Sequence, residues 1–241
     1  MKQGLFILLF LVLQSFIMNE NEVMNQESKL NGAWKLDDVA HDEVLIFIDG
    51  YFTQSVFNRT TKEFTGTRGG TYSYLNGELK VKYEFDTADE TAIGSTKTYR
   101  LDLDGDELKT DLNGSMQEWE QEDEGEGNLS GLWKISARMQ NNEMREIHQS
   151  GTRKTIKILS ATRFQWAAID PGKKQFSGTG GGKYEFKDGK YIEHIEFFSR
   201  DSARVGSSLQ FDGKLENGDW HHSGKSSKGD DIYEVWKRKG N

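Results

Sequence analysis

The chain has no cysteine and only one proline among its 241 residues. The lack of cysteine excludes disulfide bonds and thiolate metal sites, so the fold must be stabilised by packing and backbone hydrogen bonds. Lysine and arginine number 31 against 39 acidic residues, and the two signs are interspersed along the chain. Because phosphate binding relies on clustered basic side chains, the sequence predicts no nucleic-acid partner.

Long apolar runs are also lacking, except at the N-terminus. Lys2 precedes an apolar run from Leu5 to Leu13, and polar residues follow from Asn19. The run is shorter than the roughly 20 apolar residues that span a bilayer, and its pattern is typical of a secretory signal peptide. No Ala-x-Ala cleavage site is visible, and without cysteine there is no lipobox. We predict that residues 1–22 are a signal peptide or N-terminal anchor. The protein would then be exported to the periplasm, the outer surface or the medium, with no membrane span in the mature chain.

The remaining chain contains an internal repeat. The segment Leu30–Lys35 is matched by Leu129–Lys134, and both contain Gly-x-Trp-Lys. Further matches follow in the same order: Phe64–Thr67 with Phe176–Thr179, Gly69-Gly70 with Gly181-Gly182, Tyr72 with Tyr184, and Trp119 with Trp236. A collinear series of this kind indicates a duplication. We predict one repeat over residues 28–121 and a second over residues 129–239.

Within each repeat, apolar and polar residues alternate in short segments separated by turn signals, which indicates strands. Asn76-Gly77 and Asp188-Gly189 are hairpin dipeptides, because type I′ turns need positive φ at both central residues. The expected strands of the first repeat are Ala33–Leu36, Val44–Asp49, Tyr51–Phe57, Thr67–Tyr74, Glu78–Phe85, Thr96–Leu103, Glu107–Leu112 and Ser115–Glu120. The fold class predicted is therefore all-β, with two tandem eight-stranded antiparallel up-and-down barrels.

Two segments fall outside this strand pattern. Residues 122–128 are acidic and lie between the repeats, so we expect a solvated linker. Ala137–Arg153 is longer than its counterpart in the first repeat. We expect an ordinary surface loop there, with a short helix acting as a lid as the alternative.

A Gly-x-Trp near the first strand, with a basic residue at the end of the last strand, resembles the lipocalin and calycin pattern. In the second repeat, Trp133 with Lys237 or Arg238 fits this pattern, whereas Trp34 faces Glu120 and Gln121. The second repeat also resembles uncharacterised lipocalin-like secreted bacterial proteins, through Gly178-Thr179, Tyr184, Tyr191–Glu193 and Glu234–Arg238. The resemblance implies a barrel in which a cation packs on the tryptophan, and we expect this contact in the second repeat alone.

The fifth strand differs between the repeats in one informative position. In the first repeat, alternation places Leu79, Val81, Tyr83 and Phe85 on the inner face. Their counterparts are Tyr191, Glu193, Ile195 and Phe197, so a carboxylate replaces Val81. A buried charge needs a partner or a shifted pKa. We expect Glu193 either to bind a ligand or to form an internal contact with a tyrosine, Arg163 or a histidine.

These observations lead to three hypotheses on function. In the first, a small, partly apolar ligand binds in the second barrel without a cofactor. The ligand-binding residues predicted are Glu193, Tyr191, Tyr184, Trp166, Phe164 and His221. In the second, the protein is an enzyme with Glu193 as general acid or base. In the third, both barrels are filled, and the protein is a structural or adhesion module.

Two other motifs predict no site. His221 and His222 are adjacent and point to opposite faces of a strand, while His194 is expected to face outward, so we predict no metal site. Gly178–Gly182 lacks the Lys-Ser/Thr of a phosphate-binding loop, and the first repeat has a similar Gly66–Gly70. A bulge or a closely packed barrel corner is the expected role of these glycines.

Overall fold

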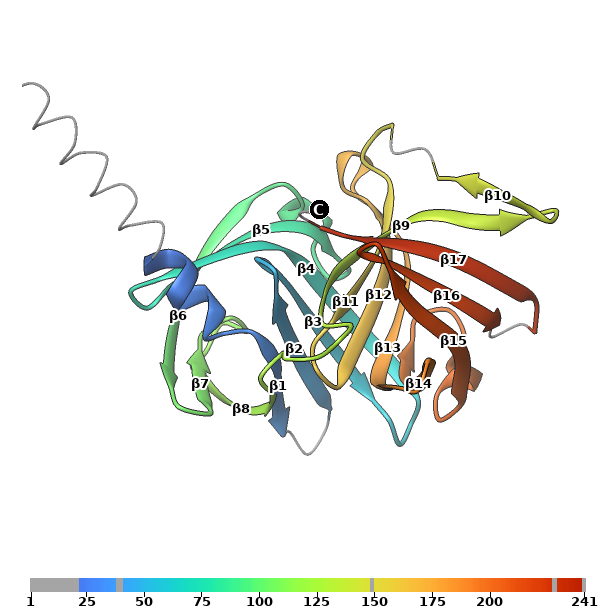
Figure 1. Cartoon of the computed structure of the whole chain (residues 1–241). Coiled ribbons are helices and arrows are strands. Elements are labelled where there is room, and N and C mark those ends of the chain that lie inside the picture. Colours follow the sequence, from blue (N-terminus) through green and yellow to red (C-terminus); the bar gives the residue numbers. More distant parts are fainter. Residues whose placement is uncertain (1–21, 38–40, 148–149, 227–228, 240–241) are drawn as a thin grey trace, which may run out of the picture.

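The computed structural model describes residues 22–37, 41–147, 150–226 and 229–239. The predicted signal segment, residues 1–22, lies outside this range except for its last residue. The chain forms two antiparallel barrels side by side (Figure 1), which confirms the predicted all-β tandem architecture. In the described ranges, no helix is long and apolar enough to cross a membrane.

The first barrel is an eight-stranded meander in which each strand pairs with the next and β1 pairs with β8. Its strands are β1 (Gly32–Asp37), β2 (Asp42–Ile48), β3 (Tyr51–Asn58), β4 (Glu63–Leu75), β5 (Glu78–Asp86), β6 (Thr96–Asp104), β7 (Glu107–Thr110) and β8 (Gln117–Asp123). Residues 22–28 are helical and precede β1. Leu30 follows this helix and is buried in the barrel core. The helix packs at the barrel end near Tyr74 and Asn76, whose backbone N–H groups donate to Glu27 Oε1 at 3.2 Å and Gln26 Oε1 at 2.8 Å.

The second barrel repeats this order and closes between β9 and β17. Its strands are β9 (Gly131–Gln140), β11 (Lys154–Leu159), β12 (Arg163–Asp170), β13 (Gln175–Lys187), β14 (Lys190–Phe198), β15 (Ser208–Glu216), β16 (Asp219–Lys225) and β17 (Asp231–Arg238). The long segment after Ala137 is neither a plain loop nor a helix in its first half. It extends β9 and pairs with β10 (Glu143–Glu146) as a hairpin that projects from the barrel (Figure 1).

The tryptophan of each first strand is buried and anchored in the same way. Trp34 Nε1 donates to the carbonyl of Leu30 at 2.9 Å, and Trp133 Nε1 donates to that of Leu129 at 2.8 Å. In the second barrel the Arg238 guanidinium lies 4.8 Å from the centroid of the Trp133 ring. The predicted cation–π contact of the second repeat is therefore confirmed.

A bulge in β5 and β14 changes which side chains face the barrel interiors. Gly69 pairs with Phe85 and Gly70 with Tyr83, so Glu84 is an extra residue on β5. A bulge of this kind shifts the alternation of side chains. Phe85 therefore lies in the cluster between the barrels, and Phe197 does the same in the second repeat. The expectation that these two phenylalanines face inward was wrong.

The glycines before the bulge allow this packing. A Cβ on Gly69 would lie 2.6 Å from Phe85 Cζ, and one on Gly181 would lie 2.5 Å from Phe197 Cζ. A larger residue would push each ring out of the cluster. The predicted role of the glycine-rich segments as bulges and close-packing sites is confirmed.

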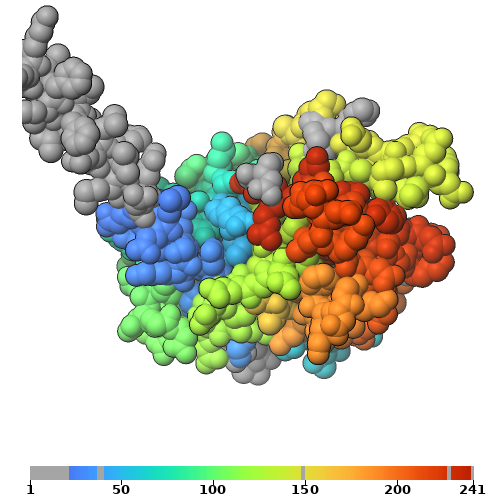
Figure 2. All heavy atoms as spheres, viewed as in Figure 1, coloured from blue at the N-terminus to red at the C-terminus, as the bar shows by residue number. Residues whose placement is uncertain are grey.

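The two barrels pack through the outer faces of β2 to β5 and β11 to β14, and their atoms meet along a common boundary (Figure 2). The aromatic contacts are reciprocal. Phe85 packs on Phe176 with centroids 6.3 Å apart, and Phe64 packs on Phe197 at 6.0 Å. Since Phe64 and Phe176 are equivalent, as are Phe85 and Phe197, the interface has an approximate two-fold relation.

Charged residues at the boundary are paired. Strand β8 runs to Asp123, so the stretch expected to be a linker begins inside the last strand of the first barrel. Glu122 pairs with the buried Arg163, which also reaches Glu196 at 2.6 Å. Asp123 accepts a hydrogen bond from Ser160 Oγ at 2.7 Å. These two acidic residues bind the second repeat and are partly buried, whereas a solvated linker was expected.

Candidate functional site

Glu193 faces the interior of the second barrel, as its alternation predicts. It is only 5% exposed, and its Oε1 lies 2.8 Å from the Nζ of Lys157 on β11. Lys157 pairs across the sheet with Trp133, as Leu45 pairs with Trp34, so Lys157 replaces Leu45. The carboxylate therefore has an internal partner, as its burial predicts. The partner is Lys157, whereas a tyrosine, Arg163 or a histidine was expected.

Four aromatic rings surround the Lys157 ammonium group. Its Nζ lies 5.1 Å from the ring centroids of Tyr191 and Trp220, 5.2 Å from that of Trp236 and 5.8 Å from that of Phe164. Ring faces attract a cation, and the attraction is stronger where water is excluded. The rings and Glu193 together stabilise a charge in an otherwise apolar interior.

A second polar pair lies beside the first. His222 and Glu234 face each other on β16 and β17, where the first repeat has Thr110 and Gln117. His222 Nδ1 lies 3.5 Å from Glu234 Oε2. Burial lowers the pKa of His222 below 6.5, against the opposing effect of Glu234, so the ring is neutral at pH 7. Burial acts to raise the pKa of Glu234, but His222 and Lys157 outweigh it and the pKa falls below 4.5.

The structure brings together some of the predicted ligand-binding residues. Tyr191, Phe164 and Glu193 all surround Lys157, and the rings of Tyr184 and Tyr191 are 5.5 Å apart. Tyr184 donates its hydroxyl to the carbonyl of Ser160 at 2.7 Å. All four predicted side chains belong to a closely packed interior.

The other two predicted residues lie elsewhere. His221 is on the outer face, with its Nδ1 2.9 Å from the Tyr233 hydroxyl. Its neighbour His222 faces inward, with its ring centroid 5.3 Å from that of Trp220. Residues two apart share a face of a strand, so Trp220 was the signal that could have identified His222. Trp166 lies at the end of the barrel and packs on Phe198.

The first barrel has a pocket of about 600 Å³ at the end opposite the N-terminal helix. Val56, Leu112 and Tyr99 contribute apolar surface, whereas Arg68 and Asp86 contribute charge. The volume lies within the roughly 300–1,000 Å³ of small-molecule pockets, and the mixed lining is also typical of them.

Arg68 is held in this pocket by three neutral acceptors. Its Nε donates to Gln54 Oε1 at 2.6 Å, and its Nη2 donates to the Leu112 carbonyl at 2.8 Å and to Asn113 Oδ1 at 2.9 Å. The amide nitrogens of Gln54 and Asn113 donate in turn to Glu43 Oε2, at 3.0 and 2.9 Å. The carboxylate thus orients both amides with their oxygens toward the guanidinium.

The corresponding end of the second barrel is filled by aromatic rings. The strand register makes Trp166, Gly180 and Phe198 the counterparts of Gln54, Arg68 and Asp86. The rings of Trp166 and Phe198 are 5.5 Å apart, and a Cβ on Gly180 would lie 2.7 Å from Trp166 Nε1. The space that holds Arg68 in one repeat thus holds an indole in the other.

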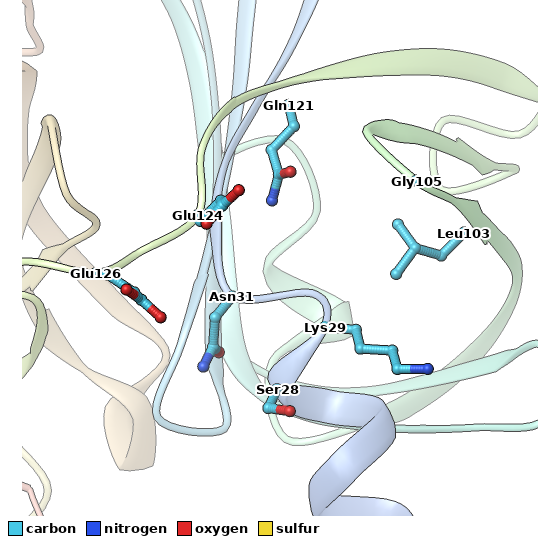
Figure 3. Close-up of a pocket in the computed structure, with 8 residues that line it drawn as sticks. All are labelled: Ser28, Lys29, Asn31, Leu103, Gly105, Gln121, Glu124 and Glu126. Atoms are coloured by element: carbon cyan, nitrogen blue, oxygen red, sulfur yellow. The ribbon is translucent and has the colours of Figure 1, made fainter.

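A further pocket of about 410 Å³ lies where the N-terminal helix meets the first barrel. Figure 3 shows Lys29 and Leu103 on one side of it and Glu126 on the other. The surrounding side chains are mostly polar and exposed. Of the residues that line this pocket, Leu103 alone has an apolar side chain, so the pocket is more polar than the one at the opposite end.

Comparison with protein-family models gives no match for this chain, and comparison with curated proteins gives none either.

Proposed function

We propose that this protein binds a small molecule in the pocket at the end of the first barrel opposite the N-terminal helix, hereafter the open end. The difference between the repeats supports this proposal most directly. At this end of the second barrel, the rings of Trp166 and Phe198 fill the space. At the equivalent positions of the first barrel, Gln54 and Asp86 line a pocket of about 600 Å³. The interior of an eight-stranded barrel has room for packed side chains or for one small ligand.

The proposal places the ligand in the first barrel, whereas the sequence led us to expect it in the second. Glu193 and Tyr191 lie in a core cluster with Trp133, Phe164, Trp220 and Trp236. Glu193 is only 5% exposed and is engaged with Lys157, which also disfavours the enzyme hypothesis. We propose that the second barrel has a structural role, since its outer face supports the first barrel.

We further propose that the protein is exported and related to lipocalin-like proteins. The apolar run from Leu5 to Leu13 supports export. The tandem barrels and the packing of Arg238 on Trp133 support the relationship.

Ligand binding can be tested by placing the residues that fill the end of the second barrel at the equivalent positions of the first. The triple variant Gln54→Trp/Arg68→Gly/Asp86→Phe gives the first barrel the three residues that fill the second, so the fold should be retained. We expect the fluorescence enhancement of the neutral probe N-phenyl-1-naphthylamine to be present with the native protein and lost with this variant. Lys29→Trp, which fills the pocket at the helix end, is the matched control and should bind as the native protein does. Equal binding by the triple variant, or no binding by the native protein, would contradict the proposal.

A further inference from the structure

Arg68 carries a charge that no carboxylate balances directly. Within the described ranges it has no ion pair, its hydrogen bonds go to three neutral oxygens, and its Nη1 donates to none of the described groups. The two acidic residues of the pocket are engaged elsewhere. Asp86 Oδ1 accepts from the backbone N–H of Ala88 and Asp89, at 2.9 and 3.0 Å, and Asp89 Oδ2 lies 3.6 Å from Lys97 Nζ. The guanidinium is therefore available to a ligand.

The guanidinium is also held in place before a ligand arrives. Gln54 and Asn113 fix its Nε and Nη2, and Glu43 fixes the two amides. A donor that is already positioned loses little conformational entropy on binding. Arginine donors to a carboxylate, sulfonate or phosphate form hydrogen bonds about twice as strong as neutral ones.

Arg68 and a second cation, Lys97, both lie near the ring of Tyr83. Arg68 Cζ and Lys97 Nζ lie 5.9 and 5.8 Å from the Tyr83 ring centroid, and the Tyr83 hydroxyl is 2.8 Å from that of Tyr99. Val56 and Leu112 provide apolar surface in the same pocket. The lining therefore combines a fixed guanidinium with apolar surface, in a pocket of about 600 Å³.

We propose that the ligand is amphipathic, with an apolar body and one anionic oxygen group that pairs with Arg68. This inference rests on the proposed function, because it assigns the ligand class of the same pocket. Arg68 is the residue that determines this class. The second barrel has Gly180 at the equivalent position and has no counterpart of this charge.

The test compares two probes that share one ring system. 1-Anilinonaphthalene-8-sulfonate carries a sulfonate, and N-phenyl-1-naphthylamine lacks it. We expect Arg68→Met to weaken binding of the sulfonate about tenfold to a hundredfold, the range given by loss of a charged hydrogen bond. Binding of the neutral probe should change less than about twofold, because that probe uses the apolar surface alone. Arg68→Lys keeps the charge without the planar fork and should lie between these results.

Arg145→Met, on the exposed hairpin far from the pocket, is the matched control and should leave both affinities unchanged. Retained binding of the neutral probe by Arg68→Met also shows that the pocket is intact. If Arg68→Met bound both probes as the native protein does, the ligand class would be overturned while the proposed function stood. If Arg68→Met and Arg68→Lys lost binding of both probes equally, Arg68 would have a purely structural role, and the ligand class would also be overturned. Absence of binding by the native protein would overturn the proposed function itself.

Displacement of the bound sulfonate probe identifies the source of the anionic group. We expect decanoate or decyl phosphate to displace it and decanol to displace it at least about tenfold less well, since decanol lacks the charge. Better displacement by decanoate assigns a carboxylate, and better displacement by decyl phosphate assigns a phosphate. Equal displacement by decanol would contradict an anionic ligand.

Discussion

The two barrels share one strand order and differ in where their polar residues lie. In the first, charged and amide side chains gather at the open end, around Arg68. In the second, rings close that end, and the charges of Lys157 and Glu193 lie in the centre of the barrel. One backbone framework therefore accommodates a pocket with polar walls or a core with an internal ion pair.

The polar residues of the second core occur as facing pairs. Lys157 and Glu193 replace Leu45 and Val81, while His222 and Glu234 replace Thr110 and Gln117. A single charge in an apolar core is strongly destabilising, whereas a matched pair is tolerated. In the second barrel, Lys157 thus lies beside Glu193, and His222 lies beside Glu234.

Removing one member of the central pair should have the largest effect. Glu193→Val leaves the Lys157 ammonium buried without its carboxylate and should lower the free energy of unfolding by about 3–5 kcal/mol. Lys157→Leu/Glu193→Val recreates the pair found in the first barrel, and its stability should equal or exceed the native value. Urea denaturation of the two single variants and the double variant measures the coupling. If the two single losses simply added in the double variant, the pair would not be the stabilising unit.

The pH dependence of stability should distinguish the second core from the first. His222 has a pKa below 6.5 in the folded protein because it is buried. The unfolded chain therefore takes up a proton near pH 6.5 that the folded chain does not, and stability falls as the pH falls below this value. The slope has an upper limit of about 1.4 kcal/mol per pH unit, which is the value for one proton.

His222→Thr, which introduces the residue of the first barrel, should flatten this slope just below pH 6.5. His194→Thr is the control, because His194 lies on the outer face beside Ser208 and should leave the slope unchanged. The pKa values of Glu122 and Glu234 are lowered below 4.5, so stability is lost below pH 4.5 as these groups are protonated. These two groups therefore do not contribute to the slope just below pH 6.5. A native slope retained by His222→Thr would show that another group titrates.

Removing the Arg238 cation that packs on Trp133 should have the smallest effect on stability. Arg238 pairs with Trp133 as Gln121 pairs with Trp34, so Arg238→Gln makes the second barrel resemble the first. Loss of the cation–π contact should lower stability by about 0.5–2 kcal/mol. Gln121→Arg should raise the stability of the first barrel by a similar amount, as measured by thermal unfolding. Equal stability of all three proteins would show that the contact contributes nothing.

Much of the fold could be predicted because two-residue alternation and hairpin dipeptides are local signals. The side on which Phe85 lies could not, since one extra residue in a bulge reverses the face and alternation does not reveal it. Lys157 could have been found, because the comparison that singled out Glu193 also aligns Lys157 with Leu45. The pocket could not, because Gln54, Arg68, Asp86 and Asn113 come from different strands and loops that meet only in the folded barrel.

The reciprocal contacts of Phe85 with Phe176 and of Phe64 with Phe197 have the geometry of an isologous interface, the type that joins identical subunits. In a homodimer every substitution appears twice, so a lysine at the position of Leu45 would enter both cores at once. Here both halves belong to one polypeptide, and each position changes alone. Covalent linkage thus gives the molecule the packing of a symmetric dimer together with two independently variable interiors.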